Sequence, residues 1–162
     1  MKETFAIPAV GAIIVKHVGD EEYILVQTRE KNSCDGTDGL LEIPAGKIRE
    51  YENIFEALKR EVWEETGLHI TKIYGEEERQ VLDIDGNKTI LFNPYCITQN
   101  LSGAYSLILS TFLCEAEGEL LEKTNEAENI RWMKRDNLKK MVENESEKIF
   151  LMHVNALGKY LA

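Results

Sequence analysis

Hydrophobic residues form two runs near the start of the chain, at residues 5–16 and 22–29. The first run reads FAIPAVGAIIVK and the second EYILVQTR, and the segment between them contains Gly19 and Asp20. Short apolar runs bounded by turn residues are typical of strands, and a glycine next to an acid suits a tight turn. The pattern therefore predicts two antiparallel strands joined by a hairpin.

The middle of the chain carries the periodicity of a helix. Asn53 with Glu56 three positions later fits a capping box, and Gly67 stands where a left-handed C-terminal cap is wanted. Apolar residues recur between these ends at the helical spacing, at Phe55, Leu58 and Val62. We expect a helix of about four turns, which follows an irregular turn at Pro44 and Gly46.

The rest of the chain alternates strand and turn patterns before a helical end. Residues 69–98 and 106–118 predict three or four further strands, and DIDGNK at 83–88 is the strongest hairpin signal. A short strand is expected at 128–133, and a terminal helix over 135–162. Strands on both sides of one central helix predict an α+β fold with a mixed sheet.

Length and composition limit the class of protein. With 162 residues, 43% of them apolar, the chain fits a single domain over 1–162. The longest apolar runs, at 7–15 and 106–114, are shorter than the ~20 residues that cross a bilayer. The start, MKETF, does not match a secretory signal, so we expect a cytoplasmic protein without a membrane partner. The net charge of −10 argues against a nucleic-acid groove.

The three cysteines, Cys34, Cys96 and Cys114, are odd in number and widely spaced. They lack the paired spacing of a zinc site or of a disulfide framework. We expect them to be small buried apolar residues.

The predicted helix and the turn before it contain six glutamates, which are not equivalent. In projection, Glu61 and Glu65 border the buried apolar stripe, whereas Glu56, Arg60 and Glu64 lie on the side expected to face outward. The outward group suits a salt-bridged surface. Glu61 and Glu65, however, are like charges one turn apart, and partial burial would raise the cost of their repulsion, so something should compensate them.

Carboxylates that converge from adjacent helical turns are hard oxygen ligands for Mg²⁺ or Mn²⁺. A divalent cation neutralises phosphate oxygens and acidifies a bound water, whose proton a nearby carboxylate can take. The chain has no GxxxxGK[ST] phosphate loop, no GxSxG motif and no Cys/His pair for acyl chemistry. The residues therefore predict metal-dependent hydrolysis of a diphosphate bond.

The segment GKIREYENIFEALKREVWEETGL, residues 46–68, resembles the signature of the Nudix hydrolase family. The matching positions are Gly46, Glu52, Arg60, Glu61, Val62, Glu64, Glu65, Gly67 and Leu68. A chance match is expected on the order of once in a hundred million starting positions. The resemblance implies the Nudix α/β/α sandwich, with a loop-helix-loop catalytic segment, over nearly the whole chain.

The resemblance also implies which atoms hold the metal ion. Glu61 and Glu65 would be ligands, with Glu64 as a further ligand or as the catalytic base. A backbone carbonyl of the turn before the helix, from Ala45 or Gly46, would complete the shell around Mg²⁺ or Mn²⁺.

Other residues complete the catalytic set that the resemblance implies. Arg60 would orient the carboxylates, and Glu52 would pair with Arg60 or with a metal-bound water. Nudix enzymes take their catalytic base from different glutamates. Besides Glu64, the late loop TNEAEN here offers Glu128, and equally Glu126.

The residues that lead into the signature segment suggest a class of substrate. EIPAGKI, at 42–48, is similar to the entry in Nudix enzymes that cleave ADP-ribose and nucleotide sugars. That similarity implies a small-molecule nucleotide, a nucleoside diphosphate linked to another group. Two departures oppose it: the proline those enzymes carry beyond Gly67 is absent, since Leu82 and Asp83 occupy that region, and so is their long N-terminal extension. No substrate-binding residue is assigned.

Two alternative functions stay open: a house-cleaning pyrophosphatase for noncanonical nucleoside triphosphates, and a non-catalytic module that senses a nucleotide. Degenerated modules generally lose signature carboxylates, whereas this chain keeps all four and Arg60. Trp63 projects away from the apolar stripe, which suits contact with a late loop or with a second subunit, and Trp132 is expected in the core. The oligomeric state is left as monomer or homodimer.

Overall fold

The protein is described by a computed structural model that covers residues 1–32 and 34–162. The strands of its large sheet are β1 (Ile7–Val18), β2 (Glu21–Arg29), β3 (Leu41–Glu42), β4 (Ala45–Lys47), β5 (His69–Ile73), β8 (Cys96–Gln99), β9 (Leu107–Glu117) and β10 (Ala127–Lys134). Five of them lie in the order β10, β2, β1, β9, β5, while β3 pairs with β2, β4 with β1 and β8 with β9. Because β1 and β9 run parallel and the other pairs antiparallel, the sheet is mixed, as predicted.

The N-terminal hairpin agrees with the sequence pattern. β1 and β2 are antiparallel, with Val18 opposite Glu21 across a two-residue turn. The middle of β1 is buried on both faces, which explains why its sequence is a continuous apolar run rather than an alternating one. Val10 packs in the core under one face of the sheet and Ile13 in the core under the other.

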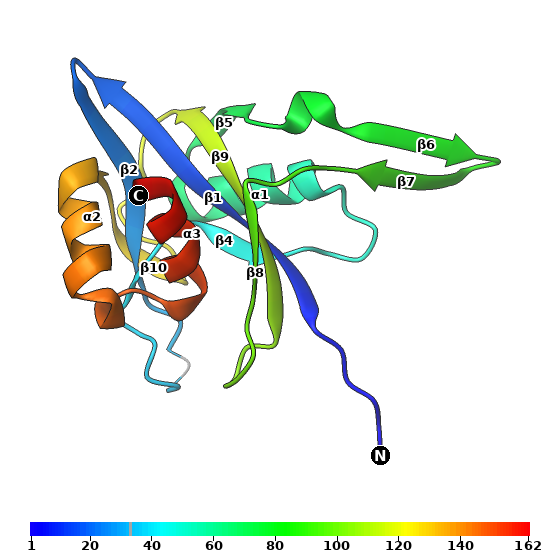
Figure 1. Cartoon of the computed structure of the whole chain (residues 1–162), viewed down its shortest axis with the longest axis horizontal. Coiled ribbons are helices and arrows are strands. Elements are labelled where there is room, and N and C mark those ends of the chain that lie inside the picture. The colour runs from blue at the N-terminus through cyan, green and yellow to red at the C-terminus, as the bar shows by residue number, and fades with distance from the viewer. Residues whose placement is uncertain (33) are drawn as a thin grey trace.

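Helices cover both faces of the sheet, which gives three layers (Figure 1). The helical elements are α1 (Ile54–Thr66), α2 (Arg135–Asn144) and α3 (Leu151–Leu161), with short 3₁₀ turns η1 (Glu76–Glu78) and η2 (Ser146–Lys148). Helix α1 packs on one face around Leu58, and α2 and α3 pack on the other around Leu138 and Leu157. The predicted α+β arrangement with helices on both sides of a mixed sheet is confirmed.

Both ends of α1 have the capping residues that the sequence predicts. Asn53 Oδ1 accepts a hydrogen bond from the Phe55 N–H at 2.9 Å. Gly67 has a φ of 81°, and its N–H donates to the Trp63 carbonyl. The predicted capping box differs from this cap, because Asn53 bonds to Phe55 instead of Glu56, and Glu56 forms an ion pair with Lys59. The helix is therefore fixed in place by local signals at each end.

Strands β6 (Gln80–Ile84) and β7 (Asn87–Leu91) form a separate two-stranded ribbon that projects from the body (Figure 1). The predicted hairpin is confirmed, because Asp85 and Gly86 both have positive φ, at 51° and 84°, as a type I′ turn requires. The expectation of three or four strands in this part of the chain is too low. The structure has five, from β5 to β9.

The single terminal helix predicted over 135–162 is wrong. The chain breaks between α2 and α3, where Ile149 bridges to Leu41 and the Phe150 N–H donates to the Leu41 carbonyl at 2.8 Å. Ile149 and Phe150 are buried, so their pairing with β3 stabilises an extended segment where helical periodicity alone would continue the helix.

Candidate active site

Helix α1 brings three glutamates to one end of the sheet. Its rotation is fixed because Leu58 and Val62 are fully buried against the strands. In this orientation Glu65 is 3% exposed, while the side chains of Glu61 and Glu64 are 12% and 49% exposed. Glu61 and Glu65 thus lie at the border of the buried stripe, where the helical projection places them.

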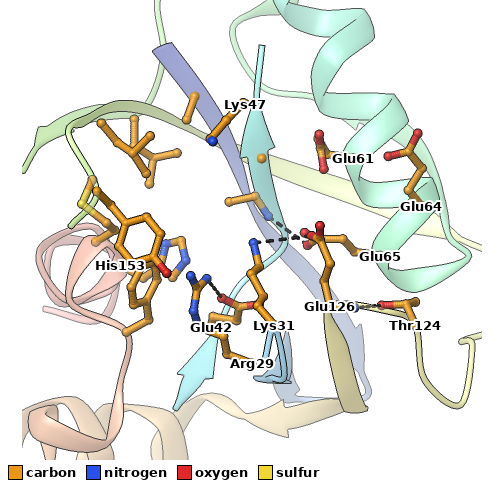
Figure 2. Close-up of a pocket in the computed structure, with 18 of the residues that line it drawn as sticks. Arg29, Lys31, Glu42, Lys47, Glu61, Glu64, Glu65, Thr124, Glu126 and His153 are labelled. Carbon is orange, nitrogen blue, oxygen red and sulfur yellow. Dashed lines mark hydrogen bonds and ion pairs between the residues drawn. The ribbon is translucent and has the colours of Figure 1, made fainter. Parts of the chain in front are cut away.

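The three glutamates line one end of a cleft of about 630 Å³. Figure 2 shows the cleft between α1 on one side and α3 on the other, with β4 crossing behind it. Acidic and basic side chains both line it: Glu42, Glu61, Glu64, Glu65 and Glu126, with Arg29, Lys31, Lys47, Arg49 and Arg60. A volume of this size accommodates a small-molecule ligand.

Glu65 is held by donors on one oxygen only. Its Oε2 accepts hydrogen bonds from Gln27 Nε2 at 3.0 Å and from the Ala45 N–H at 3.1 Å. Its Oε1 is buried and has no hydrogen-bond partner in the described part of the chain. Burial, and after it the nearby charge of Glu42, raises the pKa of Glu65 well above its usual value. The free Oε1 is therefore an unsatisfied hydrogen-bond acceptor in a buried position, where the charged form of a carboxyl group is strongly disfavoured.

Arg60 connects the glutamates of α1 to the loop before the helix. Its guanidinium donates to Glu52 at 2.8 and 2.9 Å, to Glu61 at 2.6 Å and to Glu64 at 3.3 Å. The hydrogen bonds from Arg60 lower the pKa of Glu52 to about 2. The projection predicts an outward Arg60, but its side chain is only 17% exposed, because it folds back over the loop and also donates to the Lys47 carbonyl.

Gly46 allows the turn of β4 to lie against Glu61. A Cβ at position 46 would come within 2.1 Å of the Glu61 carboxyl carbon. Only a residue without a side chain leaves the carboxylate in its present position. The glycine of the signature therefore has a packing reason in this structure.

The glutamates of the cleft have the chemistry of metal ligands but not the arrangement of a formed metal site. Among residues 1–32 and 34–162, no group of three or more His, Cys, Asp and Glu side chains is arranged to hold a metal ion. One oxygen of Glu61 already accepts a hydrogen bond from Arg60, at 2.6 Å. The donor set still fits a hard divalent cation, because Glu65 has a free buried oxygen and burial raises the pKa of Glu61 as well.

Ala45 was expected to supply a carbonyl ligand. It lines the cleft beside Glu65, to which its N–H donates. The role of its carbonyl stays a prediction.

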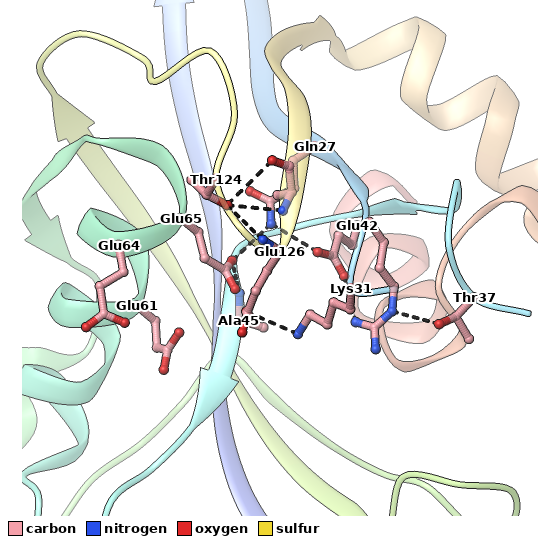
Figure 3. Close-up of polar contacts among 12 residues, drawn as sticks. Gln27, Lys31, Thr37, Glu42, Ala45, Glu61, Glu64, Glu65, Thr124 and Glu126 are labelled. Atoms are coloured by element: carbon pink, nitrogen blue, oxygen red, sulfur yellow. Dashed lines mark hydrogen bonds and ion pairs between the residues drawn. The ribbon is translucent and has the colours of Figure 1, made fainter. Parts of the chain in front are cut away.

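The two candidate bases of the late loop occupy different places. Glu126 lines the cleft, where it forms an ion pair with Lys31 at 3.4 Å (Figure 3). Glu128 is exposed on β10, opposite Thr28 of β2, and is not among the residues that line the cleft. The structure therefore brings Glu126, and not Glu128, to the glutamates of α1, because β10 begins between them at Ala127 and the chain leaves the cleft there.

Three buried polar residues at the cleft are not expected from the sequence: Arg29 and Glu42 line it, and Gln27 lies behind it, in contact with Glu42. Gln27 and Arg29 of β2 and Glu42 of β3 are polar and buried, and Gln27 pairs directly with Glu42 in the strand register. One available signal was the spacing of Gln27 and Arg29, two positions apart at the end of an apolar strand, which puts them on one face. No local pattern in the sequence indicates that Gln27 contacts Glu65, as it does in the structure.

The end of the cleft away from α1 is aromatic and basic. The Arg29 guanidinium lies over the rings of Phe150 and Tyr105, 4.1 and 5.1 Å from their centroids. Burial, with the charges of Arg29 and Lys31, lowers the pKa of His153 to about 3, so its imidazole is neutral at pH 7. Nothing in the sequence separates His153 from the other two histidines, because its burial arises from the packing of α3 against the sheet.

The tryptophans and cysteines lie away from the cleft. Trp63 is half exposed and stacks on His69, with 4.5 Å between ring centroids. Trp132 packs against the core on the α1 side, as expected. Cys114 is buried, as expected, and burial raises the pKa of its thiol, but Cys34 is exposed.

Comparisons with known proteins agree with this architecture. A family model described as the NUDIX domain matches residues 7–152. A comparison with curated proteins found no match. In the described part of the chain, no helix is long and apolar enough to span a membrane.

Solved structures share the fold. A MutT protein from Methanosarcina mazei Go1 superposes with a TM-score of 0.60 at 20% identity, over 95% of this chain and 91% of that one. A NUDIX hydrolase from Nitrosomonas europaea gives 0.64 at 15% identity, over 99% and 72%. An Ap4A hydrolase from C. elegans gives 0.53 at 12% identity, over 96% and 97%. The TM-scores show a common fold, and identities this low leave the substrate open. The domain match over most of the chain shows that the protein belongs to the Nudix family and is a hydrolase of pyrophosphate bonds.

Proposed function

We propose that the protein hydrolyses the diphosphate bond of a nucleoside diphosphate linked to another group, such as ADP-ribose or a nucleotide sugar. The observation that carries this proposal is the pair of chemically different ends in one cleft. Helix α1 supplies carboxylates at one end, and Arg29, Tyr105 and Phe150 line the other. A diphosphate that carries a group on each side suits such a cleft, and the EIPAGKI entry is similar to that of enzymes for this substrate class.

The proposal assigns the metal end to α1. Glu61, Glu64 and Glu65 would hold Mg²⁺ or Mn²⁺, with the Ala45 carbonyl as a further ligand. When bound, the cation neutralises phosphate oxygens and makes a water more acidic. The free Oε1 of Glu65 supports this assignment, since it lacks any other partner in residues 1–32 and 34–162.

Arg60 and Glu52 would act through the carboxylates. Arg60 contacts both Glu61 and Glu64, so it holds them at the mouth of the cleft and offsets their repulsion. Glu52 in turn accepts two hydrogen bonds from Arg60, which keeps the guanidinium from turning toward solvent. Both residues would position ligands rather than touch the phosphate.

The general base would be Glu64 or Glu126. Either accepts a proton from water as the water oxygen bonds to one phosphorus and the bridging oxygen leaves with the other phosphate. Glu128, the third residue expected from the sequence, lies outside the cleft, so we propose Glu126 in its place. Lys31, beside Glu126, offers a positive charge for phosphate oxygens.

The domain organisation, location and oligomeric state are proposed from the sequence. We propose a single domain over 1–162 that acts in the cytoplasm, as a monomer or homodimer, on a small-molecule nucleotide. The net charge of −10 makes a metal ion the natural mediator between this protein and a phosphate substrate.

Product analysis by chromatography tests the proposal. The wild-type protein is incubated with Mg²⁺ or Mn²⁺ and with ADP-ribose, nucleotide sugars, dinucleoside polyphosphates or nucleoside triphosphates. AMP with a sugar phosphate is the expected result. Pyrophosphate released from triphosphates would point to house-cleaning instead, and nucleotide binding without turnover would point to a sensing module.

A further inference from the structure

A buried glutamine joins two carboxylates behind the metal end of the cleft. Gln27 of β2 is 0% exposed, and Glu42 and Glu65 beside it are 4% and 3% exposed. We propose that Gln27 is a positioning residue, which fixes the Glu65 carboxylate so that one oxygen stays available to a divalent cation. The inference rests on the proposed function, in that it takes Glu65 to be a metal ligand.

The contacts of Gln27 are specific to its amide nitrogen. Nε2 donates to Glu65 Oε2 at 3.0 Å and to Glu42 Oε1 at 3.1 Å (Figure 3). A glutamine amide carries two N–H donors, and here each one meets a carboxylate. With the amide reversed, its carbonyl oxygen would face two anionic oxygens, so the nitrogen must be the inner atom.

No other neutral side chain of this length gives two donors to two acceptors. Methionine and leucine fill the volume without a donor, glutamate adds a third negative charge, and asparagine is shorter by one methylene. Loss of the donors would leave Glu42 and Glu65 facing each other unscreened, at a place where repulsion between buried like charges is strong.

Gln27 belongs to a row of hydrogen-bonded side chains that continues through Glu42 and Arg29 to Thr37. Glu42 Oε2 accepts from Arg29 Nη1 at 3.1 Å, and Arg29 Nε donates to Thr37 Oγ1 at 2.9 Å. Each partner thereby fixes the next, from Thr37 through Arg29, Glu42 and Gln27 to Glu65. The row explains why polar residues occupy the buried ends of β2 and β3.

The consequence falls on the orientation of Glu65. Gln27 and the Ala45 N–H both bind Oε2, from the strand side, so the carboxylate cannot rotate freely. Oε1 is the oxygen that keeps no partner within the described residues, and it is the one left for a cation. Residues that orient metal ligands in this way typically change metal affinity about 10–100-fold when replaced.

Mn²⁺ binding to the metal-free protein tests the inference without relying on turnover. Titration calorimetry or the resonance signal of free Mn²⁺ gives the dissociation constant for wild type, Gln27→Met and Gln80→Met. Gln80→Met makes the same chemical change on exposed β6, away from the cleft. Thermal unfolding of each protein is measured in parallel.

We expect Gln27→Met to weaken Mn²⁺ binding by about 10–100-fold, while Gln80→Met binds like wild type. In turnover assays the Mg²⁺ concentration for half-activation should rise, and the KM for nucleotide at saturating Mg²⁺ should stay near the wild-type value. If Gln27 had a purely structural role, Gln27→Met would lower the melting temperature without raising the Mg²⁺ requirement at an unchanged KM for nucleotide. If Gln27→Met does not fold, Gln27→Asn, which keeps an amide but shortens its reach, serves instead.

Unchanged Mn²⁺ affinity in a folded Gln27 variant would overturn the inference while leaving the proposed function intact. A wild-type protein that neither binds Mn²⁺ nor turns over any nucleotide would instead remove the proposed function. The two failures are therefore distinguishable in one set of measurements.

Discussion

The carboxylate of Glu61 occupies the space that a side chain on Gly46 would fill, with a Cβ at that position only 2.1 Å from the Glu61 carboxyl carbon. Gly46→Ala must displace the carboxylate, which is the movable end of a flexible side chain. We expect turnover to fall by about a hundredfold, because misplacement of catalytic groups by about 1 Å has that effect. The backbone should tolerate the change, so the melting temperature should stay close to that of wild type.

Gly158→Ala on α3 is the matched control, since its Cβ would meet only Val142 Cγ1, at 4.0 Å. It should leave turnover unchanged and raise stability by roughly 0.5–1 kcal/mol, as alanine replaces glycine within a helix. Wild-type turnover in Gly46→Ala would contradict the claim that the position of the Glu61 carboxylate against Gly46 matters for catalysis.

Glu52 and Arg60 make a pH-dependent contribution to stability. The pKa of Glu52 is lowered in the folded protein to about 2, so the pair stabilises the fold above pH 4.5, the ordinary value of the group. That contribution is lost as the pH falls toward 2. At pH 7, Glu52→Gln should cost about 1–2 kcal/mol, a few degrees in Tm.

Melting curves of wild type and Glu52→Gln across this pH range check the sign. The difference in Tm should be constant above the ordinary pKa of a glutamate and should shrink below it. A difference that grows toward low pH would show that the Arg60 contact does not favour the ionised form of Glu52.

Glu126 and Glu128 differ by two positions and by their access to the cleft. If Glu126 is the base, Glu126→Gln should remove the acidic limb of the pH profile of kcat/KM and lower its plateau by roughly 10²–10⁴-fold. Glu128→Gln should keep both. If neither loop variant changes the pH profile, the loop takes no part in the proton transfer. The same assay on Glu64→Gln then tests Glu64 as the base.

Binding of a cation to the α1 end should raise thermal stability. At a concentration of Mn²⁺ one hundred times its Kd, the gain is about 2.7 kcal/mol, or several degrees in Tm. EDTA should reverse the shift and abolish turnover. Glu61→Gln should reduce the shift, whereas an equal shift in that variant would place the ion elsewhere on the protein.

The elements that the sequence predicts well are those with local causes. The first two strands follow from contiguous apolar runs, and α1 is marked at both ends by Asn53 and Gly67. The break between α2 and α3 was missed because its cause is distant: Ile149 pairs with Leu41, which is far away in the sequence. Periodicity alone carries no information about such a pairing.

The site divides in the same way. Glu61, Glu64 and Glu65 are recognisable because one helix presents them at fixed spacing. Gln27 reaches Glu65 only through the folding of β2 against α1, a separation of 38 positions. Likewise, which glutamate of the late loop enters the cleft depends on where β10 begins, and this is set by pairing of Ala127 with Arg29.

The most direct test of the account compares Glu65→Gln with Glu56→Gln on the same helix, using turnover of ADP-ribose with Mg²⁺. Glu56 points outward and pairs with Lys59, whereas Glu65 is buried at the end of the cleft. We predict that Glu65→Gln lowers kcat by roughly a hundredfold or more while its Tm without metal does not fall, because a buried charge has been removed. Glu56→Gln should stay within a few-fold of wild type. Retained turnover in Glu65→Gln, or an equally deep loss in Glu56→Gln, would contradict the assignment of the α1 carboxylates to catalysis.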